Sequence, residues 1–110
     1  MPLKELEFIQ INLKKAFSAA VELNSSLKET KEYVALLTEP YIYNGKVASA
    51  PPESTVLSEG AEPRAAIIAN KSVRITKIDQ LSNRDCIVGI IKTEKERIII
   101  ASIYMDIKKK

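Results

Sequence analysis

Two polar residues stand at the ends of apolar segments in the first forty residues. Asn12 follows residues 8–11, and Glu39 follows residues 34–38. A carboxylate at the end of a buried strand is costly in free energy unless it is paired or bound to a cation. Mg²⁺ binds one or two carboxylates together with water and phosphate oxygens, which makes Glu39 the candidate metal ligand. The alternative is an exposed Glu39 that begins a loop.

Asn12 has two interpretations that do not exclude each other. Its amide can donate a hydrogen bond to a phosphate or to a metal-bound water without adding charge, which would make it a catalytic residue. It can also cap the helix that the pattern predicts from about Lys14, because asparagine is among the strongest N-cap residues.

Three tyrosines extend this candidate site. Tyr104 ends the last apolar segment, and it would reach the same edge as Asn12 and Glu39 if its strand runs parallel to theirs. Its alternative role is to plug the end of the sheet. Tyr41 and Tyr43 could stack on nucleic-acid bases, as aromatic side chains do in nucleic-acid grooves. They could equally pack on their own scaffold.

The elements that must position these residues are two strands and a helix. Residues 6–12 and 34–39 are predicted to be buried strands. Between them, apolar residues recur at helical spacing at Leu13, Ala16, Phe17, Ala20, Leu23 and Leu27. Parallel neighbouring strands need such a crossover. The sequence therefore predicts a βαβ unit, with reactive groups at the carboxyl ends of its strands.

The rest of the chain divides into a loop and a series of strands. Residues 41–63 are rich in proline, glycine and serine and predict a long loop, with a turn at Asn44-Gly45. Pro51-Pro52 argues against a central strand there. Residues 65–69, 73–78, 86–93 and 97–104 predict an antiparallel meander. Residues 87–91 and 98–101 are apolar at nearly every position, so we expect both faces of these strands to be buried.

Composition fits one small α/β domain in an intracellular compartment, cytoplasmic or nuclear. The chain has 110 residues, 45% of them hydrophobic, and a net charge of +3, part of which comes from residues 108–110. We expect that tail to be solvated. The single Cys86 allows no internal disulfide. We expect no signal peptide and no membrane span, because no apolar run is long enough.

Five segments in order resemble the endonuclease/exonuclease/phosphatase superfamily. They are Ile-Gln-Ile-Asn-Leu at 9–13, Leu-Leu-Thr-Glu-Pro-Tyr at 36–41, Arg-Ala-Ala-Ile at 64–67, residues 82–85, and Ala-Ser-Ile-Tyr at 101–104. The second and third are most similar to the apurinic-type endonuclease domain of non-LTR retrotransposons. The resemblance covers the first half of such a domain. It implies a single partial domain over residues 1–110, with a long loop at about 40–63, and half of a four-layer αββα sandwich.

The resemblance also implies a chemistry. Asn12 would lie beside the metal and the scissile phosphate, Glu39 would hold Mg²⁺ or Mn²⁺, Tyr104 would contact phosphate, and the partner would be DNA. Arg84-Asp85 would have a structural role. The chain has no histidine and no later Gly-Asp-Phe-Asn-like segment, which in the family supply acid-base and water-activating groups. We therefore expect an amino-terminal endonuclease fragment that is inactive alone.

The sequence permits one function of another class. A small non-catalytic α/β module would self-associate through its sheet, because an unpaired apolar edge strand is a template for pairing with another chain.

Overall fold

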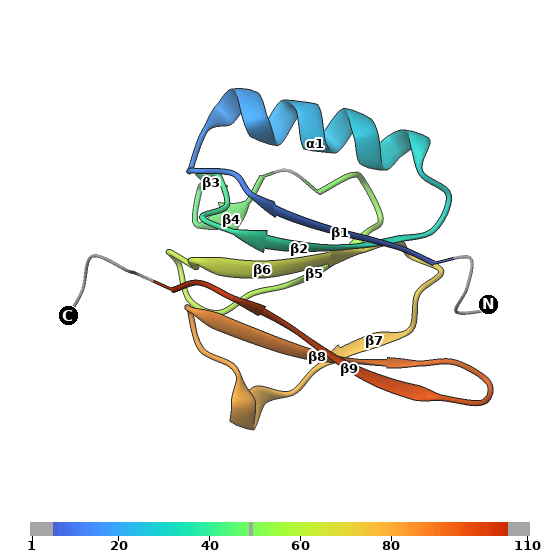
Figure 1. Ribbon diagram of the computed structural model, residues 1–110. Coiled ribbons are helices and arrows are strands. Elements are labelled where there is room, and N and C mark those ends of the chain that lie inside the picture. Colours follow the sequence, from blue (N-terminus) through green and yellow to red (C-terminus); the bar gives the residue numbers. More distant parts are fainter. Residues whose placement is uncertain (1–5, 49, 106–110) are drawn as a thin grey trace.

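The computed structural model describes residues 6–48 and 50–105, which form three layers: one α-helix, a four-stranded first sheet and a three-stranded second sheet (Figure 1). The first sheet has the strand order β1-β2-β6-β5, and the second β7-β8-β9. The elements are β1 (Glu7–Asn12), α1 (Phe17–Glu29), β2 (Tyr33–Thr38), β3 (Ile42–Tyr43), β4 (Lys46–Val47), β5 (Thr55–Leu57), β6 (Ala65–Ala69), β7 (Ile75–Lys77), the 3₁₀ helix η2 (Asp79–Leu81), β8 (Cys86–Lys92) and β9 (Arg97–Ile103). The terminal lysines 108–110 lie outside the described residues.

The βαβ unit is confirmed. Strands β1 and β2 are parallel neighbours, and α1 packs its buried residues Ala20, Leu23 and Leu27 over the first sheet. The helix begins at Phe17 rather than near Lys14. Lys14 has a φ of 51°, in the left-handed region that a right-handed helix cannot include. The predicted helix start was therefore too early.

The antiparallel meander is confirmed for β7, β8 and β9, but its predicted first strand belongs elsewhere. Strand β6 pairs with β2 in the first sheet. The backbone N–H of Asn70 donates to the Tyr33 carbonyl at 3.0 Å, which keeps the end of β6 beside β2. The link at residues 70–74 therefore crosses from the first sheet to the second. The apolar pattern of a strand does not identify its partner, and this was the cause of the error.

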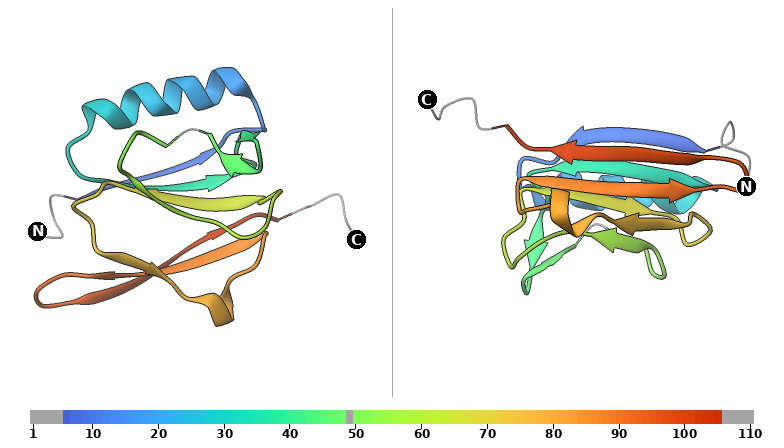
Figure 2. Two further views of the ribbon diagram at one scale, coloured as in Figure 1. Left: turned by 180° about the vertical axis from the view of Figure 1, so that it is seen from behind. Right: turned by 90° about the horizontal axis from the view of Figure 1, so that it is seen from below.

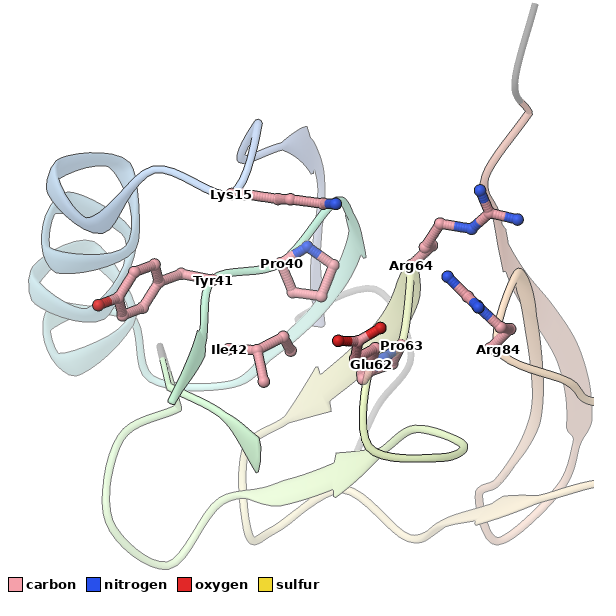
Figure 3. Close-up of a pocket in the computed structure, with 8 residues that line it drawn as sticks. All are labelled: Lys15, Pro40, Tyr41, Ile42, Glu62, Pro63, Arg64 and Arg84. Carbon is pink, nitrogen blue, oxygen red and sulfur yellow. The ribbon is translucent and has the colours of Figure 1, made fainter. Parts of the chain in front are cut away.

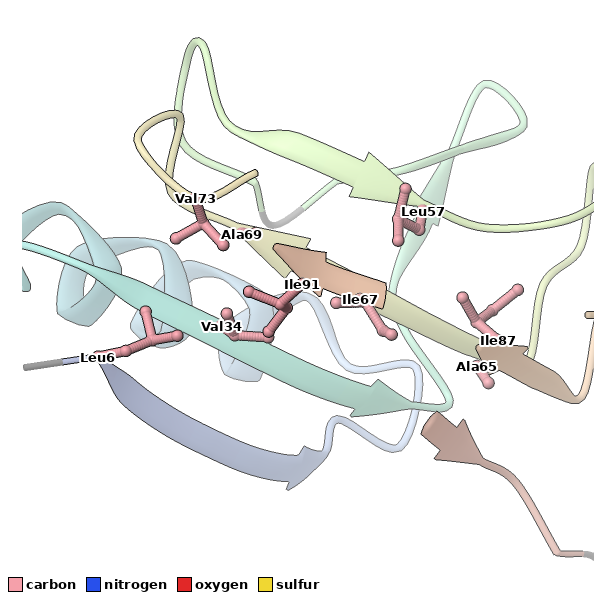
Figure 4. Close-up of a cluster of buried hydrophobic side chains, with 9 residues drawn as sticks. All are labelled: Leu6, Val34, Leu57, Ala65, Ile67, Ala69, Val73, Ile87 and Ile91. Carbon is pink, nitrogen blue, oxygen red and sulfur yellow. The ribbon is translucent and has the colours of Figure 1, made fainter. Parts of the chain in front are cut away.

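One buried cluster packs α1 on the first sheet. The other lies between the two sheets, and its side chains come from both (Figure 4). Its fully or nearly buried members are Leu6, Val34, Leu57, Ala65, Ile67, Ala69, Val73, Ile87 and Ile91. One polar residue joins the sheets directly. The hydroxyl of the buried Ser102 on β9 donates to the Leu37 carbonyl on β2 at 2.6 Å, so β9 lies over β2.

Strands β1 and β9 are more exposed than predicted. The outward side chains Ile99 and Ile103 of β9 are 64% and 56% exposed, and Phe8 of β1 is 46% exposed. Strand β1 is an edge strand, and α1 lies on the first sheet, away from the outer face of the second sheet (Figure 1). An apolar run shows what a strand could bury, but not whether another layer covers it.

The predicted long loop is interrupted by short strands, which the sequence did not indicate. Residues 41–63 include β3, β4 and the edge strand β5. The turn at Asn44 and Gly45 is confirmed, because both have positive φ, 53° and 74°, as a two-residue hairpin turn requires. Strand β5 was missed because it has only three residues. Among the described residues no helix is long and apolar enough to cross a membrane.

Candidate functional site

The carboxyl ends of β1 and β2 bring Asn12 and Glu39 together. The amide Nδ2 of Asn12 donates to Oε1 of Glu39 at 3.1 Å. Its other amide atom, Oδ1, accepts from the backbone N–H of Lys14 at 2.7 Å. The N-cap position of α1 is Ala16, which makes no side-chain cap bond. The capping interpretation of Asn12 is therefore wrong, and its side chain orients Glu39 instead.

The backbone around this pair is locally strained. Glu39, Lys14 and Lys15 have φ angles of 46°, 51° and 57°. Such angles are uncommon outside glycine and are concentrated at functional sites, where surrounding contacts maintain them. Two hydrogen bonds do so here: the Glu39 N–H donates to the Arg64 carbonyl at 2.9 Å, and the Lys15 N–H donates to the Glu39 carbonyl at 2.8 Å. Glu39 is thus held in one orientation from both sides.

Tyr104 lies at the same end of the molecule as this pair. Strand β9 runs in the same direction as β1, as the right-hand view shows (Figure 2). The Tyr104 N–H donates to the Asp85 carbonyl at 2.8 Å, and the Arg64 guanidinium stands 4.9 Å from the centre of the Tyr104 ring. Because the Arg64 carbonyl also accepts from Glu39, Arg64 connects the tyrosine to the candidate metal ligand.

Asp85 has a structural partner that the sequence analysis missed. Its two carboxylate oxygens accept from Nε and Nη2 of Arg64, each at 2.6 Å, in a bidentate ion pair. Nε of Arg84 lies 3.7 Å from Oδ1 of Asp85. Asp85 therefore pairs most closely with Arg64, 21 residues away in sequence, and at a longer distance with its neighbour Arg84. That separation gives no local signal.

A hollow of about 250 Å³ opens beside the strand ends (Figure 3). Its lining residues are Lys15, Pro40, Tyr41, Ile42, Glu62, Pro63, Arg64 and Arg84. Three of them, Lys15, Arg64 and Arg84, are cations, and Glu62 is an anion; Arg64 and Arg84 also lie against Asp85. Lys15 was not predicted as a site residue, and Arg84 was expected to have only a structural role. Their positions next to predicted strand ends could have indicated that they lie near the site.

The two candidate stacking tyrosines differ in environment. The Tyr41 ring packs edge to face on Phe17, with 5.4 Å between the ring centres. Tyr43, on the β3–β4 hairpin, is 65% exposed. Tyr41 thus contributes to the scaffold at the start of α1, whereas the Tyr43 ring is accessible to a ligand.

The donor set near Glu39 suits one kind of metal. Among residues 6–48 and 50–105, no three His, Cys, Asp or Glu residues lie close enough together to hold an ion. A transition-metal site built from three protein ligands therefore has no basis in the described residues. A single carboxylate is compatible with Mg²⁺, which retains water and takes phosphate oxygens as further ligands.

Comparison with known proteins supports the fold. No family model matches the chain, and no curated protein matches it. Among solved structures, it is similar to the "Endonuclease domain of TRAS1, a telomere-specific non-LTR retrotransposon", with a TM-score of 0.67 and 21% sequence identity. The match covers 90% of this chain but only 44% of that one. The expected α+β sandwich is confirmed: the chain has the fold of part of a retrotransposon endonuclease domain.

Proposed function

We propose that this chain is the metal- and phosphate-contacting part of a Mg²⁺-dependent DNA endonuclease domain of retrotransposon type. The observation that carries the proposal is the hydrogen bond between Asn12 and Glu39, which fixes a carboxylate at the carboxyl ends of two parallel strands. Ligand sites of open α/β sheets lie at this edge. The cationic hollow lined by Lys15 and Arg84 adjoins it.

Each residue has a distinct role in this proposal. Glu39 would provide the protein carboxylate for Mg²⁺, which when bound neutralises negative charge on a phosphodiester. Asn12 orients that carboxylate through Nδ2. Tyr104, held by Arg64, would donate its phenolic hydrogen to a phosphate oxygen. Lys15 and Arg84 would bind a neighbouring phosphate, and Tyr43 would stack on a base.

These residues bind and orient, but they do not supply acid-base catalysis. The chain has no histidine, and among the described residues no three His, Cys, Asp or Glu side chains gather in one place. General acid-base catalysis contributes about 10²- to 10⁴-fold to a rate. We therefore propose that the chain binds metal and DNA phosphates weakly and does not cleave DNA alone.

Metal binding is tested by titrating Mn²⁺ into isotopically labelled protein. Paramagnetic broadening in NMR spectra should be strongest for the amide signals around Glu39 and Asn12. Glu39→Gln should remove it, whereas Glu22→Gln on the solvent face of α1 should not. Equal broadening in the Glu39→Gln protein would show that the metal ligand is another residue.

Catalysis is tested by plasmid nicking with Mg²⁺. We expect no nicking above the background of a mock purification. Nicking that requires metal and disappears in Glu39→Ala would contradict the inactive state, while supporting Glu39 as the ligand. Nicking above the mock background that persists in Glu39→Ala would contradict both the inactive state and the assignment of Glu39 as the metal ligand.

A further inference from the structure

One end of the sandwich has the shape of a step. The first sheet has four strands and the second has three, and β9 lies over β2 through the bond from Ser102 to Leu37. Strand β1 therefore extends beyond β9, as the view from below shows (Figure 2). We call the part formed by β1 and β9 the stepped end. Each of these strands has one side without a strand partner among the described residues.

The stepped end exposes apolar side chains on both strands. Phe8 pairs with Val34 in register, so it shares the face of the first sheet that is turned toward the second sheet. No described strand covers it there, and it is 46% exposed. Ile99 on the outer face of β9 is 64% exposed. A strand placed beside β9 would therefore pair with its free edge and bury Phe8 beneath it.

We propose that a second copy of this chain occupies the stepped end. Rotation by 180° about an axis parallel to the strands and midway between the sheets exchanges the two layers. This rotation sets β1 of the second copy beside β9, and β9 of the second copy beside β1. Each continuous sheet then contains the four strands of one first sheet and the three of one second sheet. The interface is isologous, as expected for a two-fold dimer.

The strand directions are compatible with this arrangement. Strands β1 and β9 point the same way (Figure 2). A rotation about an axis along the strands leaves their direction unchanged, so each new pair is parallel. Parallel pairs form regular hydrogen bonds along their whole length. With six residues in β1 and seven in β9, both pairs can form along nearly all of each strand.

The register of the two strands brings complementary side chains together. Ser102 bonds to Leu37, which is opposite Ile11 on β1, so Ser102 and Ile11 lie at about the same level. Arg97 precedes Ser102 on β9, and Glu7 precedes Ile11 on β1, by nearly the same number of residues. In the dimer, Arg97 therefore lies within about one residue's rise of Glu7 of the second copy. Arg97 and Glu7 are both exposed and both belong to the outer faces of their sheets.

After Arg97 and Glu7, the next outward-facing residues along β9 and β1 are apolar. Ile99 would lie beside Ile9 of the second copy, and Ala101 beside Ile11 of the second copy. Opposite charges and apolar side chains are thus each matched across the new pair, which stabilises neighbouring strands. A partner that fits the stepped end must project one strand beyond the other in the layer beside β9, and it must leave room for β1 in the opposite layer. The chain itself has that shape, and this favours a second copy over an unrelated partner.

The first test is the molar mass of the full chain by size-exclusion chromatography with light scattering. We expect a dimer at protein concentrations of tens of micromolar. Ile99→Lys should give a folded monomer, because it sets a charge in an apolar contact. Val21→Lys, on the exposed face of α1, should remain dimeric and serves as the matched control. Circular dichroism establishes that both variants fold.

A charge exchange tests the register. Arg97→Glu and Glu7→Arg should each raise the dimer dissociation constant about tenfold, because the two-fold axis repeats each contact. The double variant should return to within about twofold of the wild-type value. Analytical ultracentrifugation measures all four proteins. Failure of the double variant to recover would contradict the Arg97–Glu7 contact.

Other outcomes would overturn the dimer itself. These are a folded monomer at several hundred micromolar, an open series of larger assemblies, or a dimer that Ile99→Lys leaves intact. The proposal is independent of the endonuclease function. Glu39→Gln should leave dimerisation unchanged, so failure of one proposal does not affect the other.

Discussion

The two ends of the sandwich differ in how their edge strands are protected from pairing with other chains. At the stepped end, β1 and β9 have six and seven residues. At the opposite end, which we call the closed end, the edge strands β5 and β7 have three residues each. Short edge strands and edge lysines are devices that prevent pairing with other chains. The closed end uses both devices, and the stepped end uses neither.

Lys77 provides the charge at the closed end. Its ammonium donates to the Glu59 carboxylate and, at 3.1 Å, to the Ser58 carbonyl. Ser58 and Glu59 directly follow β5, whereas Lys77 belongs to β7. These contacts therefore connect the edges of the two sheets, and a lysine lies where another strand would have to pair.

Apolar side chains are also more tightly packed at the closed end than at the stepped end. Leu57 on β5 is 9% exposed, whereas Phe8 on the opposite edge is 46% exposed. Gly89 on β8 permits close approach at the closed end, since a Cβ there would lie 3.2 Å from methyl carbons of both Ile75 and Leu57. The difference teaches that this fold can protect an edge within its own chain. The stepped end lacks such protection, which is the basis of the dimer proposed above.

Truncation of one apolar residue at each end should show the largest contrast. Leu57→Ala should lower the free energy of unfolding by about 2–4 kcal/mol, because it removes buried methyl groups and leaves a cavity. Phe8→Ala should cost less than about 1 kcal/mol in the monomer, because much of its ring is already hydrated. Urea denaturation at low protein concentration measures both. Equal losses would contradict the contrast between the ends.

Filling the close approach at Gly89 should have a smaller effect. Gly89→Val should destabilise by about 1–3 kcal/mol, because the Leu57 and Ile75 side chains must move to admit the new methyl groups. Thr76→Val, at an exposed position of β7, should remain within about 0.5 kcal/mol of the wild type. Thermal unfolding compares the two variants. A stabilised Gly89→Val protein would show that the closed end has unused space.

The ion pair at the closed end should give the smallest effect, visible as a pH dependence. The hydrogen bond to Glu59 raises the pKa of Lys77 above its ordinary value of 10.5. Because the folded pKa is the higher one, this contribution is complete below pH 10.5 and is lost as the pH rises through the folded pKa. We expect a contribution of about 0.5 kcal/mol. Lys77→Met should show a flatter stability profile between pH 9 and about pH 12, and an unchanged slope would contradict the pairing.

Part of the candidate site could be predicted from sequence. Asn12 and Glu39 follow apolar strands, and parallel strands joined by a helix must end at one edge, so their proximity follows from local pattern and chain connectivity. The role of Asn12 in orienting Glu39 could not be predicted. It depends on the left-handed backbone at Lys14 and Lys15, which displaces the helix start and frees the amide from capping.

The contacts of Arg64 were also inaccessible to sequence reasoning. Arg64 forms its ion pair with Asp85 and lies over Tyr104, two residues that are far away in the chain. Charge-pair preferences have no fixed sequence spacing outside a helix or hairpin. The cationic hollow shared by Lys15 and Arg84 likewise exists only because separate loops meet at one edge.

The sequence by itself determined the local elements: the amphipathic helix, the turn at Asn44 and Gly45, and the apolar strands, because side-chain periodicity and turn chemistry act over a few residues. Only the tertiary structure decided which strand lies beside which and which faces remain open. Strand β6 joined β2 rather than β7, and the isoleucines of β9 remained exposed. The physical reason is that burial depends on what covers a face, and that cover comes from distant parts of the chain or from another molecule.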